Sequence, residues 1–327
     1  MTDDTYRVGI IGAGLAGLMA GRTLRDSGIA VTLFDKGRRP GGRANTREHG
    51  PHRFDHGAQF FTVRDPALRE ITESWIAAGI VEEWTGSLVR IQGEEIGPAK
   101  PSIRYVGVGG MITLPSYLAQ ELDVRTDTRV ESLDLEDSTW TLFADDGSVL
   151  GRFDAVLVAV PAPQAVSLLS PVPELQSEAA RVEMAPCWAG MYVFERPLGL
   201  GFDGAFLGNN PLSWIARDSS KPGRSDVEAW VLHAGPDWTR ANLEMDRVEA
   251  AGALLREFRN RFGPLPKVTF QRAHRWSFAL VSGPAPGGAL FDAARAIGAC
   301  GDWCNAGRIE GALSSGMAAA ERVLNRT

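Results

Sequence analysis

The hydrophobic pattern of the first 35 residues alternates two short apolar runs with a helical stretch. The first run, Val8 to Ile11, leads into the glycine-rich segment 12–17, and the second, over 30–34, ends at Asp35. Between the runs, four apolar residues fall on one face of a helix: Leu15, Leu18, Met19 and Leu24. The pattern predicts strand, turn, helix and strand within about 30 residues, which is the unit that builds parallel sheets.

The turn of this unit has the spacing Gly-x-Gly-x-x-Gly, at Gly12, Gly14 and Gly17. Gly12 lets the chain turn tightly, Gly14 lets a pyrophosphate approach the backbone, and Gly17 lets the helix pack closely on the sheet. The free N–H groups of the first helical turn point at the phosphates, and Asp35 accepts hydrogen bonds from a ribose. Many loops are rich in glycine, so the glycine spacing alone is weak evidence. Here the glycines follow a predicted strand and begin a predicted helix, and a second strand ends at an acid, so the whole pattern predicts a dinucleotide-binding site.

The rest of the chain mixes strands and helices. An uninterrupted apolar run over 155–160 predicts a strand buried on both faces, so we expect the same parallel sheet to resume there. Further strands are predicted over 124–135, 139–143, 187–194, 229–233, 268–275 and 296–300, with a hairpin turn at 145–147. Helices are predicted over 64–80, 113–122, 163–169 and 242–261 and in a segment ending near Leu324. In 242–261 the expected inward residues are Leu243, Val248, Leu254, Leu255 and Phe258.

The segment 170–287 has a different character, because it holds five of the nine tryptophans. They are Trp188, Trp214, Trp230, Trp238 and Trp276, and most of them are expected to be core residues. A pocket lined by large aromatic rings and a few polar groups is also where a substrate would bind, so this segment is the candidate substrate region.

Composition excludes several classes of function. The 327 residues are 44% hydrophobic and 23% charged with a net charge of −6, and no dense basic stripe suggests nucleic-acid binding. No apolar run reaches membrane-spanning length, and no signal peptide is expected because the first apolar run is the predicted strand. The three cysteines fit a reducing compartment such as the cytoplasm, and the five histidines form no metal-ligand pattern.

Three other segments carry candidate cofactor contacts. Arg43 follows Pro40-Gly41-Gly42, where it is placed to reach a phosphate or the edge of a flavin. Gly57 and Ala58 are small enough for the backbone to lie against a flat ring, and Gly301-Asp302 follows a predicted strand. One cofactor threaded through all these segments is an extended FAD, with pyrophosphate at 12–17, ribityl chain at Asp302 and ring near Gly57 and Ala312.

Taken together, these segments resemble those of the flavin amine-oxidase superfamily, and within it those of bacterial renalase-like proteins. The segments that carry the resemblance are 33–36, Gly41-Gly42-Arg43, 57–62, 160–165, 212–217, 230–234, 273–276 and Gly301-Asp302-Trp303-Cys304 with the Gly307–Ala312 stretch. The resemblance implies an α/β fold: a Rossmann-type FAD-binding domain with an inserted α+β substrate domain on a mixed sheet. The implied boundaries are 1–62, 105–165 and 288–327 for the FAD-binding domain, and 63–104 and 166–287 for the substrate domain.

The same resemblance implies non-covalent FAD and oxidation of dihydro-NAD(P) isomers. A hydride passes to the flavin, and O₂ is reduced to H₂O₂ as NAD(P)⁺ is released. The expected partners are a dihydropyridine dinucleotide and O₂, without nucleic acid or membrane, and the protein is expected to be a monomer or homodimer. No side chain is assigned as a catalytic acid or base, because loss of a hydride from a dihydropyridine needs no strong base.

The residues assigned from the sequence fall into two sets. The cofactor set is Gly12, Ala13, Gly14, Ala16, Gly17, Asp35, Lys36, Gly42, Arg43, Gly57, Ala58, Val130, Gly301, Asp302, Ile309 and Ala312. The substrate set is Gln59, Phe60, Phe61, Arg104, Cys187, Trp188, Trp214, Arg217 and Trp303. Arg104 and Arg217 could contact substrate phosphates, and a role in surface ion pairs is an equally good interpretation of both. His274 is interpreted as a core histidine.

Two other functions remain open from the sequence. An amine oxidase needs an aromatic cage facing the flavin and usually a lysine and water near N5, but none of the four lysines stands in a suggestive motif. A non-catalytic flavin- or nucleotide-binding module is the second alternative.

Overall fold

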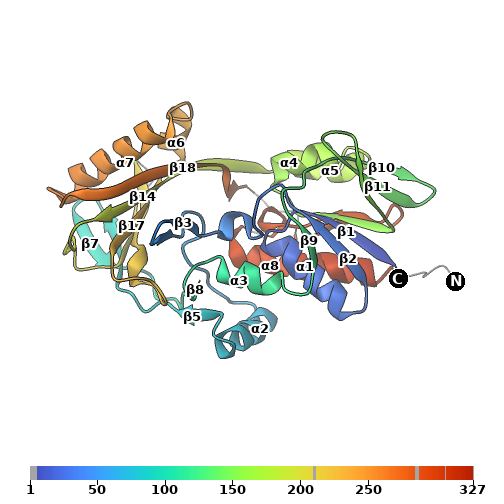
Figure 1. Cartoon of the computed structure of the whole chain (residues 1–327), viewed down its shortest axis with the longest axis horizontal. Coiled ribbons are helices and arrows are strands. Elements are labelled where there is room, and N and C mark those ends of the chain that lie inside the picture. The colour runs from blue at the N-terminus through green and yellow to red at the C-terminus, as the bar shows by residue number, and fades with distance from the viewer. Residues whose placement is uncertain (1–5, 209–210, 284–286, 306, 327) are drawn as a thin grey trace.

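The computed structural model describes residues 6–208, 211–283, 287–305 and 307–326, and Figure 1 shows their arrangement. A six-stranded sheet contains the predicted first unit. Its order is β19 (Leu290–Asp292), β20 (Ile297–Ala299), β13 (Ala155–Val158), β1 (Arg7–Ile11), β2 (Ala30–Phe34) and β9 (Asp123–Arg125). All neighbours run parallel except β19, which pairs antiparallel with β20. The predicted α/β, Rossmann-type sheet is therefore confirmed.

Two long helices pack beside this sheet. They are α1 (Leu15–Asp26) and α8 (Arg308–Leu324), drawn in blue and red in Figure 1. A Cβ atom at Gly316 of α8 would lie 2.3 Å from the carbonyl oxygen of Ala16 in α1, so the two backbones touch only because this residue is glycine. Strand β13 is buried along its whole length, as its uninterrupted apolar sequence predicts.

A seven-stranded mixed sheet forms the other half of the molecule. Its order is β18 (Val268–Ser282), β14 (Glu183–Phe194), β17 (Glu228–Ala234), β16 (Leu212–Arg217), β15 (Gly204–Leu207), β6 (Leu88–Gln92) and β7 (Glu95–Pro98). Among the described strands of this sheet, only β15 and β6 pair in parallel. Helices α6 (Pro236–Ala241) and α7 (Arg247–Phe262) lie along β14 and β18 (Figure 1).

Smaller elements complete the fold. A three-stranded sheet holds β10 (Val130–Glu136), β11 (Thr139–Ala144) and β12 (Val149–Phe153), with the predicted turn at 145–147. Two-stranded pairs are β3 (Arg47–His49) with β4 (His52–Phe54), and β5 (Val81–Glu83) with β8 (Tyr105–Gly107). The remaining helices are α2 (Pro66–Ala77), α3 (Thr113–Leu118), α4 (Ala162–Leu168), α5 (Pro173–Ala180) and the short 3₁₀ turns Gly42–Ala44, Asp218–Ser220 and Asp302–Cys304.

Three helix predictions were wrong at their ends. Helix α2 covers Pro66–Ala77 rather than 64–80. Helix α3 stops at Leu118 rather than 122, and Glu121 has a φ of +61°, which a right-handed helix does not allow. Helix α7 begins at Arg247 rather than 242, because Asp246 accepts hydrogen bonds from the N–H groups of Val248 and Glu249 and so caps the helix. Val248 therefore lies in the first turn and is 75% exposed, not inward.

No described helix combines the length and the apolarity needed to cross a membrane.

Candidate active site

A cavity of about 2020 Å³ lies between the two large sheets. Its walls come from the turn after β1, the segment 57–62, strands β6, β16 and β18, and the start of α8. Single small-molecule pockets are typically about 300–1,000 Å³, so this cavity has room for a dinucleotide and a second molecule.

The glycine turn forms one end of the cavity. A Cβ at Gly17 would lie 2.0 Å from the carbonyl oxygen of Gly12, so α1 approaches the turn more closely than any other residue would permit. A Cβ at Gly14 would meet no atom within 4 Å, so Gly14 leaves a free surface beside the first turn of α1. That surface and the unpaired N–H groups of the helix start fit the pyrophosphate of FAD.

Asp35 follows β2 at the same end of the cavity. Its carboxylate accepts hydrogen bonds from the N–H groups of Ala13 and Gly37, both at 2.7 Å. Burial raises the pKa of Asp35, while these two bonds act in the opposite direction. Each carboxylate oxygen keeps a second lone pair, so Asp35 can still accept the ribose hydroxyls that the sequence assigns to it.

Arg43 and Asp302 join the first and last parts of the chain at the cavity wall. Arg43 Nη1 and Nη2 donate to the two oxygens of Asp302 at 2.8 and 2.6 Å, and Nη1 also donates to the carbonyl of Ala279. This bidentate pair places the predicted phosphate-side arginine directly against the predicted ribityl-side carboxylate.

The segment 57–58 lies against the 3₁₀ turn that carries Arg43. The Ala58 N–H donates to the carbonyl of Arg43 at 2.9 Å, and a Cβ at Gly57 would lie 2.1 Å from that same oxygen. Ile309 and Ala312, near the start of α8, also line the cavity. A flat ring therefore has backbone on one side and the positive end of a helix within the same cavity.

Aromatic rings and an arginine form a further part of the cavity wall. The Phe206 and Trp214 ring centres lie 4.5 Å apart, and Phe60 lies 5.6 Å from Trp214. The Arg104 guanidinium lies 5.5 Å from the centre of the Phe60 ring, and it donates to the carbonyls of Lys100 and Ser102. These contacts make a rigid apolar surface with a cation at its edge.

The face of the seven-stranded sheet supplies neutral polar groups. His233, His274 and Trp276 line the cavity, and the His274 and Trp276 rings are 4.4 Å apart. Burial lowers the pKa of His233 and of His274 to about 4, so both rings are uncharged at neutral pH. Burial raises the pKa of Cys187 to about 12, so its thiol is not a nucleophile.

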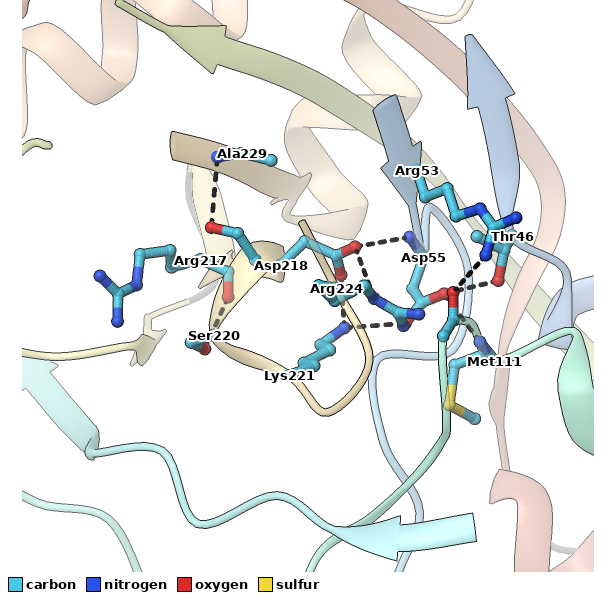
Figure 2. A network of polar contacts seen from close by, with 12 residues as sticks. Thr46, Arg53, Asp55, Met111, Arg217, Asp218, Ser220, Lys221, Arg224 and Ala229 are labelled. Atoms are coloured by element: carbon cyan, nitrogen blue, oxygen red, sulfur yellow. Dashed lines mark hydrogen bonds and ion pairs between the residues drawn. The ribbon is translucent and has the colours of Figure 1, made fainter. Parts of the chain in front are cut away.

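Asp55, Asp218, Lys221 and Arg224 form a buried charge network (Figure 2). Lys221 also contacts Gln59. Lys221 Nζ contacts Asp218 at 2.6 Å and Asp55 at 3.1 Å, and Arg224 pairs with both carboxylates. Burial raises the pKa of Asp218, whereas Lys221 and Arg224 outweigh burial at Asp55 and lower its pKa. Gln59 accepts from Lys221 and donates to the Asp55 carbonyl, so the network holds one cavity residue in place.

Most residues assigned from the sequence line the cavity, and four do not. Ala13 uses its N–H for Asp35, and Gly17 contacts Gly12. Trp188 is 2% exposed and donates from its indole to the carbonyl of Asn242, while Arg217 pairs with Asp203 at 2.6 Å. These four residues therefore lie outside the described cavity lining.

The sequence missed several residues of this region. No motif surrounds Lys221 in the sequence, yet its side chain is fully buried and bonded to Gln59. His274, expected in the core, is part of the cavity wall, and so are Arg64, Arg90 and His233. The three-residue spacing of Asp218 and Lys221 is the only local signal of the network, and it is too common to interpret alone.

No group of three or more His, Cys, Asp or Glu side chains within the described ranges could hold a metal ion.

Comparison with known proteins identifies the family. The family model described as flavin containing amine oxidoreductase matches residues 75–324, and the NAD(P)-binding Rossmann-like domain model matches residues 10–75. The chain belongs to the flavin-containing amine oxidoreductases. This family assignment makes it a flavin-dependent oxidoreductase and supports the flavin that the cavity fits.

Individual relatives agree with this assignment. Renalase of Mus musculus is 24% identical over 298 residues, which cover 84% of this chain and 85% of that protein. Cyclohexylamine oxidase from Brevibacterium oxydans IH-35A superposes with a TM-score of 0.79 at 15% identity, covering 98% of this chain and 99% of that one. A candidate protoporphyrinogen oxidase from Exiguobacterium sp. 255-15 gives a TM-score of 0.81 at 13% identity, covering 99% and 100%. At such identities the structures establish the fold alone.

Proposed function

We propose that this protein is an FAD-dependent oxidase of dihydro-NAD(P) isomers, forming NAD(P)⁺ and H₂O₂. When bound, the flavin supplies the acceptor for the hydride, and O₂ reoxidises it. The chain's own work is to hold the dihydropyridine ring flat, keep it at reacting distance and exclude water.

The distribution of charge in the cavity carries the proposal. Its described lining includes the cations Arg64, Arg90, Lys100, Arg104, Arg275 and Arg308 besides Arg43, Lys36 and Arg129. The only carboxylates in that lining are Asp35, Glu131 and Asp302, and each is engaged by backbone N–H groups or an arginine. A substrate that carries a pyrophosphate is favoured by such a cavity, whereas an ammonium ion finds no free counter-charge.

The aromatic wall supports the same substrate. Phe60, Phe206 and Trp214 offer an apolar platform for a dihydropyridine, with Arg104 beside it for a phosphate. His233 and His274 are uncharged and suit a neutral carboxamide better than an ion. Gln59, held by Lys221, adds a fixed donor and acceptor at the cavity surface.

Three finer points belong to this proposal. We propose that FAD is bound without a covalent link, because Cys187 is the only cysteine lining the described cavity and its thiol is protonated. The discontinuous domain boundaries are supported by the two large sheets, which draw on separate parts of the chain. A cytoplasmic location is supported by the three unpaired cysteines.

Rapid mixing of the oxidised, FAD-loaded protein with candidate substrates under anaerobic conditions tests the function. Dihydro-NAD and dihydro-NADP isomers should bleach the flavin, and primary amines should not. An Arg104→Gln variant should raise the dinucleotide KM more than it lowers kcat, because the phosphate contact contributes to binding.

Each alternative predicts a different result. Bleaching by amines and not by dihydropyridines would establish the amine oxidase. A yellow protein whose flavin no donor bleaches would support a non-catalytic flavin-binding module. A colourless protein that takes up NAD but not FAD would show that the cofactor is not a flavin.

A further inference from the structure

One row of side chains crosses the seven-stranded sheet on the face that lines the cavity. The strand pairing sets its members side by side from β18 to β6: His274, Ala189, His233, Trp214, Phe206 and Arg90. All of them except the small, buried Ala189 line the cavity. Ile91 and Ile215, which follow two members of the row, pack on the other face of the sheet with Phe258 of α7.

The chemical character of this row changes from one end to the other. The first end carries His274 and His233, which are neutral because burial lowers the pKa of each. The middle carries the Trp214 and Phe206 rings, and the β6 end carries Arg90. A second cation lies at the β6 end, because the guanidinium of Arg104 is 6.0 Å from the centre of the Phe206 ring. The row therefore passes from neutral polar groups through apolar rings to cations.

No described residue gives either guanidinium at the β6 end a carboxylate partner. Arg90 is exposed and makes no hydrogen bond or ion pair with the part of the chain that the structure describes. Arg104 donates to the carbonyls of Lys100 and Ser102, and its Nε is buried without a partner among the described residues. Two such cations at one end of a cavity attract an anion, and guanidinium donors match the oxygens of a phosphate.

The other end of the row lies on the flavin side. Gly57, which the sequence assigns to the flavin ring, lies against β18, since a Cβ there would be 3.3 Å from Cζ2 of Trp276. A ring that reacts with the flavin must therefore lie toward β18, away from Arg90. Neighbouring strands are about 4.8 Å apart, so Trp214 and Arg90, two strands apart, are separated by about 10 Å. A ribose and its 5′-phosphate, extended from a ring beside Trp214, span a comparable length.

We propose that Arg90 and Arg104 bind the 5′-phosphate of the ribose that carries the oxidised ring, so that the recognised unit is a dihydropyridine mononucleotide. The identity of the ring rests on the proposed function, and the new element is that the adenosine half of a dinucleotide is not needed. Beyond Arg90 the described sheet has only the edge strand β7, where Gly97 is its pairing partner. A second nucleotide extends past the row and adds less to binding than the 5′-phosphate, so dihydropyridine mononucleotides are substrates themselves.

Calorimetric titration of the oxidised, FAD-loaded protein tests the phosphate site without turnover. Nicotinamide mononucleotide should bind about tenfold more tightly than nicotinamide riboside, which lacks only the phosphate. In Arg90→Gln this difference should shrink to about threefold, because one of the two guanidinium groups is lost. Arg152→Gln removes an exposed arginine of β12 outside the described cavity lining, and it should keep the full difference. Equal binding of the two ligands by the wild type, or an unchanged difference in Arg90→Gln, would overturn the phosphate site.

Rapid mixing under anaerobic conditions tests the substrate class. A dihydropyridine mononucleotide isomer should bleach the flavin with a Kd within about threefold of that of the matching dinucleotide. Arg90→Gln should weaken the binding of both with little change in the rate of bleaching, because the phosphate contact contributes to binding. Bleaching by dinucleotides alone would overturn the mononucleotide as the recognised unit. If no dihydropyridine bleaches the flavin but the calorimetric difference is present and depends on Arg90, the proposed function fails and the phosphate site stands.

Discussion

Replacing Gly14 by alanine separates cofactor binding from folding. Gly14 has φ −75° and ψ 177°, which alanine adopts without strain, and an added Cβ meets no atom of the described chain within 4 Å. The apoprotein should therefore keep its stability or gain about 0.4–1 kcal/mol from the less flexible unfolded chain.

The same methyl group occupies the surface on which the FAD pyrophosphate is proposed to lie. Moving the phosphates outward weakens their charge-assisted hydrogen bonds to the first turn of α1, each worth about 1.5–3 kcal/mol. Since about 1.4 kcal/mol is a factor of ten, FAD should bind about 10–100-fold more weakly to Gly14→Ala.

Two measurements on the same preparation decide the matter. Fluorescence titration of the apoprotein with FAD gives the affinity, and urea unfolding gives the stability. Gly17→Ala is the matched control: its Cβ would lie 2.0 Å from the Gly12 oxygen, so it should lose stability as well, by about 1–3 kcal/mol. Wild-type FAD affinity in Gly14→Ala would refute the placement of the pyrophosphate at this turn.

Three further predictions concern buried groups. Lys221→Met should lower the free energy of unfolding by about 3–5 kcal/mol, because it leaves Asp55 and Asp218 buried with one cation. The control Lys267→Met removes an exposed lysine and should leave the free energy of unfolding unchanged. Equal urea midpoints for the two variants would contradict a stabilising role of Lys221 in the buried network. In the folded protein the pKa is about 3 for His56 and about 4 for His233 and His274, below the ordinary value of 6.5. Below pH 6.5 the unfolded chain therefore binds more protons than the folded protein does. Stability is therefore complete above pH 6.5 and should fall as the pH drops toward 4, with a shallower fall in His233→Gln; a pH-independent urea midpoint would contradict this. Burial raises the pKa of the Cys187 and Cys300 thiols to about 12, and it also raises the pKa of Cys304. A disulfide reagent should therefore label none of the three thiols until the protein unfolds. Labelling of the native protein would show that a thiol is accessible.

Local patterns predicted the cofactor half of the molecule well. The first strand, helix and second strand lie within the first 35 residues, and each glycine of the turn has a steric reason that a short sequence window contains. The confirmed family assignment also rests on motifs of this kind, which span most of the chain. Helix ends were less predictable, since the start of α7 depends on the cap formed by Asp246 rather than on apolar spacing.

The sequence by itself determined the dinucleotide-binding unit, the buried parallel sheet and the aromatic character of the middle segment, because these follow from hydrophobic period and from residues close together in the chain. Only the tertiary structure decided that Arg43 meets Asp302 and that Lys221 contacts Gln59. Those pairings join residues from distant segments. Their positions depend on how the two large sheets pack, and no local pattern encodes that packing.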